Sequence, residues 1–105
     1  MPFPSHRLGD LCELILVEFL IRKNFYVYTP FLAQRGPVDV IGISEEGKVF
    51  LFDSKADSKR VNPGRRHPDR IYRKRSDLQK ELGVIMAYVD EKTRNIYFTP
   101  EFNWR

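Results

Sequence analysis

The chain has a single cysteine and no long apolar run. One thiol, Cys12, excludes an internal disulfide, and no spacing of Cys and His indicates a zinc site. The longest aliphatic stretch, residues 14–17, ends at Glu18 and is far shorter than a membrane-spanning helix. The first ten residues, MPFPSHRLGD, lack the apolar segment of a secretory signal. We therefore expect a cytoplasmic protein that does not associate with membranes.

What the chain does have is an ordinary globular composition with unevenly placed charge. Its 105 residues are 42% hydrophobic and 30% charged, which predicts a single folded domain over residues 1–105. The net charge is +4, yet residues 55–81 contain ten Lys and Arg against four Asp and Glu. This segment therefore carries +6 and the remainder −2. Such a basic block indicates a polyanionic partner, or else only a solvated basic surface.

An apolar hairpin is the clearest local pattern. Residues 38–43 and 49–53 are rich in β-branched and aromatic residues, and residues 44–48 have turn composition. Closing that turn symmetrically places Ile41 opposite Leu51. The same register places two carboxylates, Asp39 and Asp53, opposite each other.

Opposed side chains of an antiparallel pair have Cβ atoms about 4.5–5.5 Å apart, so these two carboxylates should repel. Either one pKa must rise or a cation must lie between them. Because side chains alternate along a strand, Lys55 shares the face of Asp53, and Ser54 points the other way. Two carboxylates and an ammonium group on one face predict a functional site.

The oxygen donors of this site suit Mg²⁺, which Mn²⁺ is expected to replace. Asp39 and Asp53 would be ligands, with the backbone carbonyl of Ser54 as a third. Lys55 would orient or help to deprotonate an attacking water and oppose the charge that develops on a phosphate. The alternative is a surface ion pair between Asp53 and Lys55, which would contribute about 0–1 kcal/mol.

The basic block is expected to bind the phosphate backbone of DNA. The residues that we assign to this role are Lys59, Arg60, Arg65, Arg66, Arg70, Arg73, Lys74, Arg75 and Gln79. The last two lie one helical turn apart, so they should share a helix face.

The remaining elements predict an α/β fold with a mixed central sheet flanked by helices. We expect a helix over residues 8–23, a strand over 25–29, a helix over 70–82 capped by Asp69, and strands over 84–89 and 96–99. In the second helix Ile71, Leu78 and Leu82 should face inward. Glu13 lies at the edge of the apolar stripe of the first helix and faces either solvent or the sheet.

These residues resemble the PD-(D/E)XK nuclease superfamily. The resemblance rests on Pro37-Val38-Asp39, then Asp53-Ser54-Lys55 after thirteen intervening residues, and an upstream helix with Glu13. It covers nearly the whole chain and implies a restriction-endonuclease-like αβββαβ core with an extra C-terminal strand. This chain departs from the commonest pattern of the family at two positions. Asp53 stands where Glu is commoner, and Ser54 stands where an apolar residue is usual.

The resemblance also implies an activity, a Mg²⁺-dependent endonuclease that hydrolyses DNA. By the family pattern Asp39 and Asp53 are metal ligands, Lys55 is the catalytic lysine, and Glu13 completes the site, in contact with the metal through water. Small Holliday-junction resolvases and phage or intron endonucleases are the most similar members, and we expect a structure-specific enzyme of DNA recombination. A sequence-specific or homing-type endonuclease and a catalytically inactive DNA-binding module are the alternatives. Cutting both strands of a duplex would most simply need a symmetric dimer, so we expect a homodimer or a higher homo-oligomer.

Overall fold

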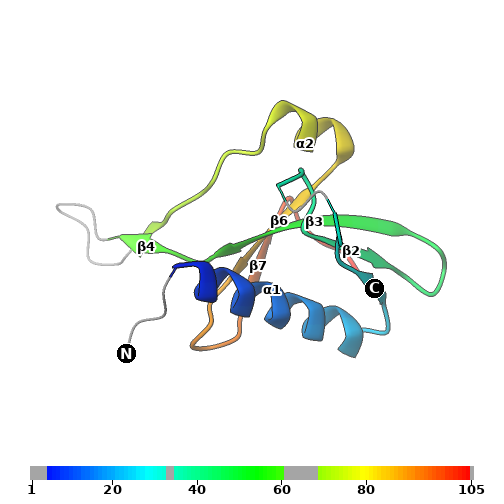
Figure 1. Cartoon of the computed structure of the whole chain (residues 1–105), viewed down its shortest axis with the longest axis horizontal. Coiled ribbons are helices and arrows are strands. Elements are labelled where there is room, and N and C mark those ends of the chain that lie inside the picture. The colour runs from blue at the N-terminus through cyan, green and yellow to red at the C-terminus, as the bar shows by residue number, and fades with distance from the viewer. Residues whose placement is uncertain (1–4, 33–34, 61–68, 105) are drawn as a thin grey trace.

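A five-stranded mixed sheet with helices on its two sides forms the fold, as the sequence predicts (Figure 1). The computed structural model describes residues 5–32, 35–60 and 69–104. Helix α1 (Ser5–Arg22) precedes strands β1 (Tyr26–Tyr28), β2 (Val40–Ile43) and β3 (Val49–Ala56). Helix α2 (Asp77–Leu82) is followed by β6 (Ile85–Val89) and β7 (Ile96–Thr99). None of the helices in these ranges is long and apolar enough to cross a bilayer.

Strand β3 lies at the centre of the sheet, whose order is β1-β2-β3-β6-β7. It pairs antiparallel with β2 and parallel with β6, and the other two pairings are antiparallel. The parallel crossover between the third strand and the strand after the second helix is therefore confirmed, as is the extra C-terminal strand β7. Strand β3 is buried at its middle, at Phe52 and Asp53, and half-buried along most of the rest of its length.

Helix α1 covers one face of the sheet, and the core lies between them. Its apolar stripe, which includes Cys12, Leu16 and Leu20, packs on Val40 and Phe52. The helix ends where Asn24 adopts a left-handed conformation with φ of 68°, a role that asparagine tolerates. Aromatic rings close the same side of the sheet: Phe25, Phe50, Phe52, Phe98 and Trp104 all lie within 6 Å of the Phe102 ring, centroid to centroid.

The turn between β2 and β3 comprises residues 44–48, as the sequence predicts. Ser44 and Lys48 are already paired, through the Ser44 amide and the Lys48 carbonyl at 2.9 Å, and Gly47 takes the left-handed position with φ of 89°. The strands meet at Ile43 and Val49, and Ile41 pairs with Leu51. The predicted register of the hairpin is confirmed.

The second helix is shorter than the sequence suggests. The expected helix over 70–82 begins only at Asp77, with Ser76 as its N-cap. Asp69, the expected cap, lies instead in strand β5 (Asp69–Arg70), which pairs with β4 (Lys59–Arg60). Residues 71–76 run extended along the sheet. Because the helix has so few residues, Leu78 and Leu82 are 51% and 45% exposed, and the prediction that they face inward is wrong.

Candidate active site at the end of the β2–β3 hairpin

The hairpin brings the two predicted carboxylates into contact. Beyond the pair Val40–Phe52 the ladder changes, because the Asp39 amide donates to the Phe52 carbonyl at 2.8 Å. Asp39 is therefore not paired with Asp53 in the ladder itself. Its carboxyl group reaches across instead, accepts the Ser54 amide at 2.9 Å, and is hydrogen-bonded to the Asp53 carboxyl group.

The contact has an electrostatic cost that shows in the acidity of Asp39. Burial, the hydrogen bond with Asp53 and the negative charges of Asp53 and Glu13 raise the pKa of Asp39 to about 6. The Ser54 amide lowers this pKa but does not compensate. The two carboxyl groups together favour a bound positive charge. Near neutral pH a metal ion can supply that charge in place of the proton on Asp39.

Asp53 is held from two further directions. It is 8% exposed, and its Oδ1 lies 3.5 Å from the Lys55 ammonium nitrogen. Its Oδ2 accepts a hydrogen bond of 2.8 Å from Nε2 of Gln79. The structure thus shows two ways in which the repulsion is reduced: the pKa of Asp39 is raised, and the Lys55 ammonium group lies beside Asp53.

Gln79 connects helix α2 to this site. Its second amide hydrogen goes to the Pro37 carbonyl at 3.0 Å, just before Asp39 in the chain. Its Oε1 accepts the Ser76 amide at 3.0 Å, and the Ser76 hydroxyl accepts the Gln79 amide at 3.1 Å, which forms a capping box. Gln79 is 9% exposed and both its N–H donors are used within the protein. We therefore reassign it from a DNA contact to a residue that positions Asp53.

Glu13 lies near the pair without joining it. It is half-buried on α1, burial raises its pKa, and its charge acts on Asp39. Within the described ranges, no three His, Cys, Asp or Glu side chains lie close enough together to hold a metal ion. The carboxylates in contact are thus Asp39 and Asp53, and a contact of Glu13 through water stays a prediction.

The backbone amide and the side-chain hydroxyl of Ser54 lie in different surroundings. Its amide lies on the Asp39 side, whereas its hydroxyl is buried and has no hydrogen-bond partner among the residues that the structure describes. The hydroxyl thus makes no contribution to the site, and an apolar residue would suit the position, in line with the commoner family pattern.

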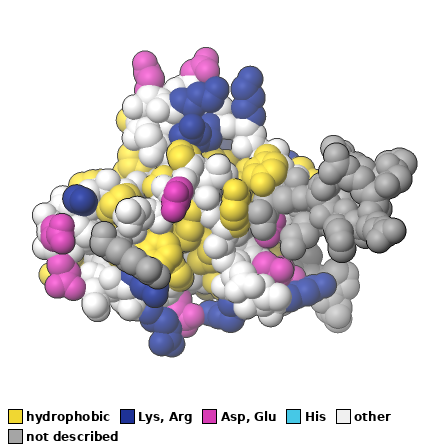
Figure 2. All heavy atoms as spheres, turned by 180° about the vertical axis from the view of Figure 1, so that it is seen from behind, with side chains coloured by type: hydrophobic (Ala, Val, Ile, Leu, Met, Phe, Trp, Pro, Cys, Tyr) yellow, Lys and Arg dark blue, Asp and Glu magenta, His cyan; other side chains and the backbone are white. Residues whose placement is uncertain are grey.

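A basic cleft of about 1000 Å³ opens over Asp53 and Lys55. Arg73, Lys74 and Arg75 line one side, and Arg35, which the sequence analysis did not assign, lies on the loop that leads to Pro37. Lysine and arginine side chains gather over α2 and the segment before it (Figure 2). Nη1 of Arg75 is already bound to the Val84 carbonyl at 3.1 Å, which fixes its direction. The position of Arg35 shortly before Asp39 in the chain was the feature of the sequence that could have indicated its place in the cleft.

The rest of the predicted DNA-binding residues are not brought to this cleft by the described structure. Arg65 and Arg66 lie outside the described residues. Lys59, Arg60 and Arg70 belong to β4 and β5, whose backbone alone is described. Their assignment stays a prediction.

The fold is similar to that of a known endonuclease. The bacterial homing endonuclease I-Ssp6803I matches with a TM-score of 0.59 and 20% sequence identity, over 92% of this chain and 70% of that one. No family model and no curated protein sequence matches. At this level of identity the likeness establishes a shared fold, and it is a nuclease that shares it.

The raised pKa of Asp39 leads to a prediction about stability. The folded state binds this proton more tightly than the unfolded chain, whose Asp39 has its ordinary pKa of 3.8. Without divalent metal, stability should therefore fall as pH rises from about 4 through about 6. The variant Asp39→Asn lacks this titration. Its free energy of unfolding relative to that of the wild type should rise over the same pH range and level off above it, as measured by urea unfolding.

A matched control is Glu46→Gln in the exposed β2–β3 turn, for which the difference from wild type should show no rise over this interval. A difference for Asp39→Asn that is constant with pH, or that increases toward acid, would contradict the account.

Proposed function

We propose that this protein is a Mg²⁺-dependent DNA endonuclease of the PD-(D/E)XK type. The observation that carries the proposal is the contact of Asp39 with Asp53, because Asp53 and Lys55 line a cleft together with four further arginines and lysines. Two acidic oxygens next to a surface for polyanions match the way in which proteins hold Mg²⁺ together with a substrate phosphate. The likeness of fold to a homing endonuclease supports the proposal.

The residues present fit the metal ion. Asp39 and Asp53 would hold it, and the Ser54 carbonyl is a further candidate, because the amide and carbonyl of one strand residue point to the same side. Bound there, the ion would polarise a phosphoryl oxygen and lower the pKa of its water. Binding would also relieve the repulsion that raises the pKa of Asp39.

The chain itself supplies orientation and charge. The Lys55 side chain is 40% exposed, so its ammonium group can reach a substrate while it stays beside Asp53. It is placed to hydrogen-bond the phosphate oxygen that gains charge as the bond breaks. Arg35 and Arg73–Arg75, on either side of the cleft, would hold the flanking phosphates, which makes affinity depend on salt.

Two substrate classes remain within this proposal. The likeness to I-Ssp6803I favours a sequence-specific or homing-type enzyme, whereas the predicted resemblance to junction resolvases favours a structure-specific one. One copy of the cleft cuts one strand, so in either case we propose that a homodimer acts on a duplex.

The first test is a cleavage panel of plasmid, duplex, flap and four-way-junction DNA with Mg²⁺, with Mn²⁺ and with EDTA. Wild type should cut at least one substrate with metal and none with EDTA. Asp53→Asn should reduce cutting to the level of the blank, and Lys55→Ala should slow it by about 10²–10³-fold. Glu45→Gln, in the exposed β2–β3 turn, should cut like wild type.

Equal cutting by wild type and Asp53→Asn would show that a contaminant is responsible. Salt-sensitive binding of DNA without cutting of any substrate would leave the inactive binding module as the better description.

Gln79 gives a second test, because one substitution separates its two roles. Gln79→Glu keeps an acceptor for the Ser76 amide, so the capping box survives, but replaces the donor to Asp53 by a carboxylate. We expect kcat to fall by about 10–100-fold, as for other residues that orient metal ligands, with little change in KM for DNA.

The control is Ser76→Ala, which removes the cap but leaves the donor to Asp53. It should lower kcat less than Gln79→Glu does, although both variants should lower the melting temperature, Gln79→Glu because it buries a carboxylate against Asp53. The reverse order of the two effects on kcat would assign Gln79 a purely structural role.

A further inference from the structure

Two tyrosines form an exposed aromatic surface next to the cleft. Tyr72 lies in the extended segment before α2, and Tyr97 lies on β7, where it pairs with Tyr88 of β6. The Tyr72 ring meets Tyr88 at 5.8 Å and Tyr97 at 6.2 Å, edge to face in both cases. Tyr88 is fully buried, whereas Tyr72 and Tyr97 are 59% and 42% exposed. We call Tyr72 and Tyr97 the tyrosine platform.

The platform is fixed in place by the buried tyrosine below it. The Tyr88 hydroxyl accepts the Arg73 amide at 2.6 Å and donates to the Arg73 carbonyl at 3.3 Å. These bonds hold residues 71–75 extended on the sheet, so that the ring of Tyr72 is positioned by its neighbour in the chain. An exposed ring that is already ordered loses little conformational entropy when a ligand packs on it.

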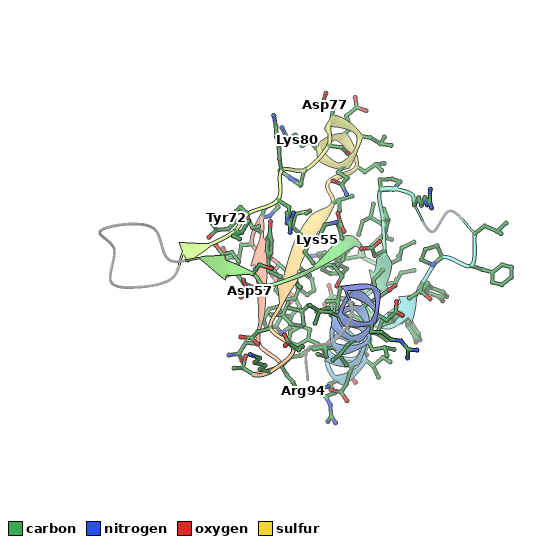
Figure 3. The ribbon with its side chains drawn as sticks, turned by 60° about the vertical axis from the view of Figure 1, so that its left-hand side comes forward. Lys55, Asp57, Tyr72, Asp77, Lys80 and Arg94 are labelled. Atoms are coloured by element: carbon green, nitrogen blue, oxygen red, sulfur yellow. The ribbon has the colours of Figure 1, made fainter. Side chains whose placement is uncertain are left out.

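The platform is also continuous with the catalytic cleft. A hollow of about 240 Å³ is lined by Tyr72, Tyr88 and the C-terminal end of β7, and it shares Arg73, Arg75 and Met86 with the cleft over Asp53. Tyr72 and Lys55 lie on the same side of the sheet, opposite the side from which Arg94 projects (Figure 3). A strand whose phosphate sits at Lys55 would therefore extend past Arg73 onto Tyr72.

We propose that the tyrosine platform stacks on a nucleobase that is unpaired near the phosphate to be cut. Every base has a face that can stack on an aromatic ring, but in a duplex that face is covered by the neighbouring base pairs. The substrate class is then DNA with single-stranded or distorted residues beside the cut, rather than a continuous duplex. This inference rests on the proposed function, since it takes the cleft as the phosphate site.

Charge and exposure together favour a base over a protein partner. The segment that carries Tyr72 continues into three consecutive cations, Arg73 to Arg75, and cations beside aromatic rings are the usual composition of single-strand binding surfaces. The exposed tyrosines of β1, Tyr26 and Tyr28, have no such cationic neighbours in their strand. They therefore provide a control surface on the same protein.

The test is binding in EDTA, where cutting does not occur. Fluorescence anisotropy is measured with a labelled oligothymidylate and with an oligomer of the same length that has no bases. Wild type should bind the oligothymidylate more tightly. Tyr72→Ala should weaken this binding about 5- to 150-fold and leave binding of the abasic oligomer unchanged, and Tyr72→Phe should keep most of the affinity.

Tyr72→Leu retains apolar packing on Tyr88 and should lose affinity like Tyr72→Ala, and Tyr28→Ala should behave like wild type. The inference is overturned if Tyr72→Ala weakens both oligomers equally or neither, or if wild type binds the two oligomers alike or fails to bind them. Base-dependent binding by a protein that cuts nothing would sustain this inference and reject the nuclease. Cutting without a Tyr72 effect would do the opposite.

Discussion

The contact between the carboxyl groups of Asp39 and Asp53 is the constraint on which the rest of this site depends. Two negative charges in contact oppose folding unless other groups reduce their repulsion, and the protein reduces it in three ways. The Asp39 carboxyl group keeps a proton to about pH 6, Lys55 lies beside Asp53, and Gln79 and the Ser54 amide donate hydrogen bonds to the pair. A structural hairpin has no need of such a contact, and the contact is therefore the basis of the metal site that we propose.

Helix α2 takes part in the site although it is short. Its capping box uses the Gln79 side-chain oxygen, while the nitrogen of the same amide bonds Asp53 and the Pro37 carbonyl. The Gln79 side chain therefore links Pro37, Ser76 and Asp53. Movement of α2 would therefore displace the hydrogen-bond donor of Asp53.

The hairpin could be predicted from the sequence because its register depends on alternation and on a symmetric turn, both local properties. The five residues 44–48 close on Ile43 opposite Val49, and Ile41 therefore has the partner that the sequence predicts. The second helix could not be predicted in the same way. Residues 70–76 suit a helix, but the Tyr88 hydroxyl captures the Arg73 backbone, and Ser76 is the better cap. Likewise, the hydrogen bond from Gln79 to Asp53 joins residues far apart in the chain, so local patterns of sequence do not predict it.

The central claim is that Asp39 and Asp53 form a metal site, and paramagnetic broadening by Mn²⁺ tests it most directly. In nitrogen–proton correlation spectra of the labelled protein, small additions of Mn²⁺ should first broaden the amide signals of Asp39, Asp53 and Ser54. The same additions to Asp39→Asn should leave these signals sharp. Broadening that begins instead at the acidic turn of Glu45 and Glu46, with the Asp53 and Ser54 signals unaffected, would contradict the account.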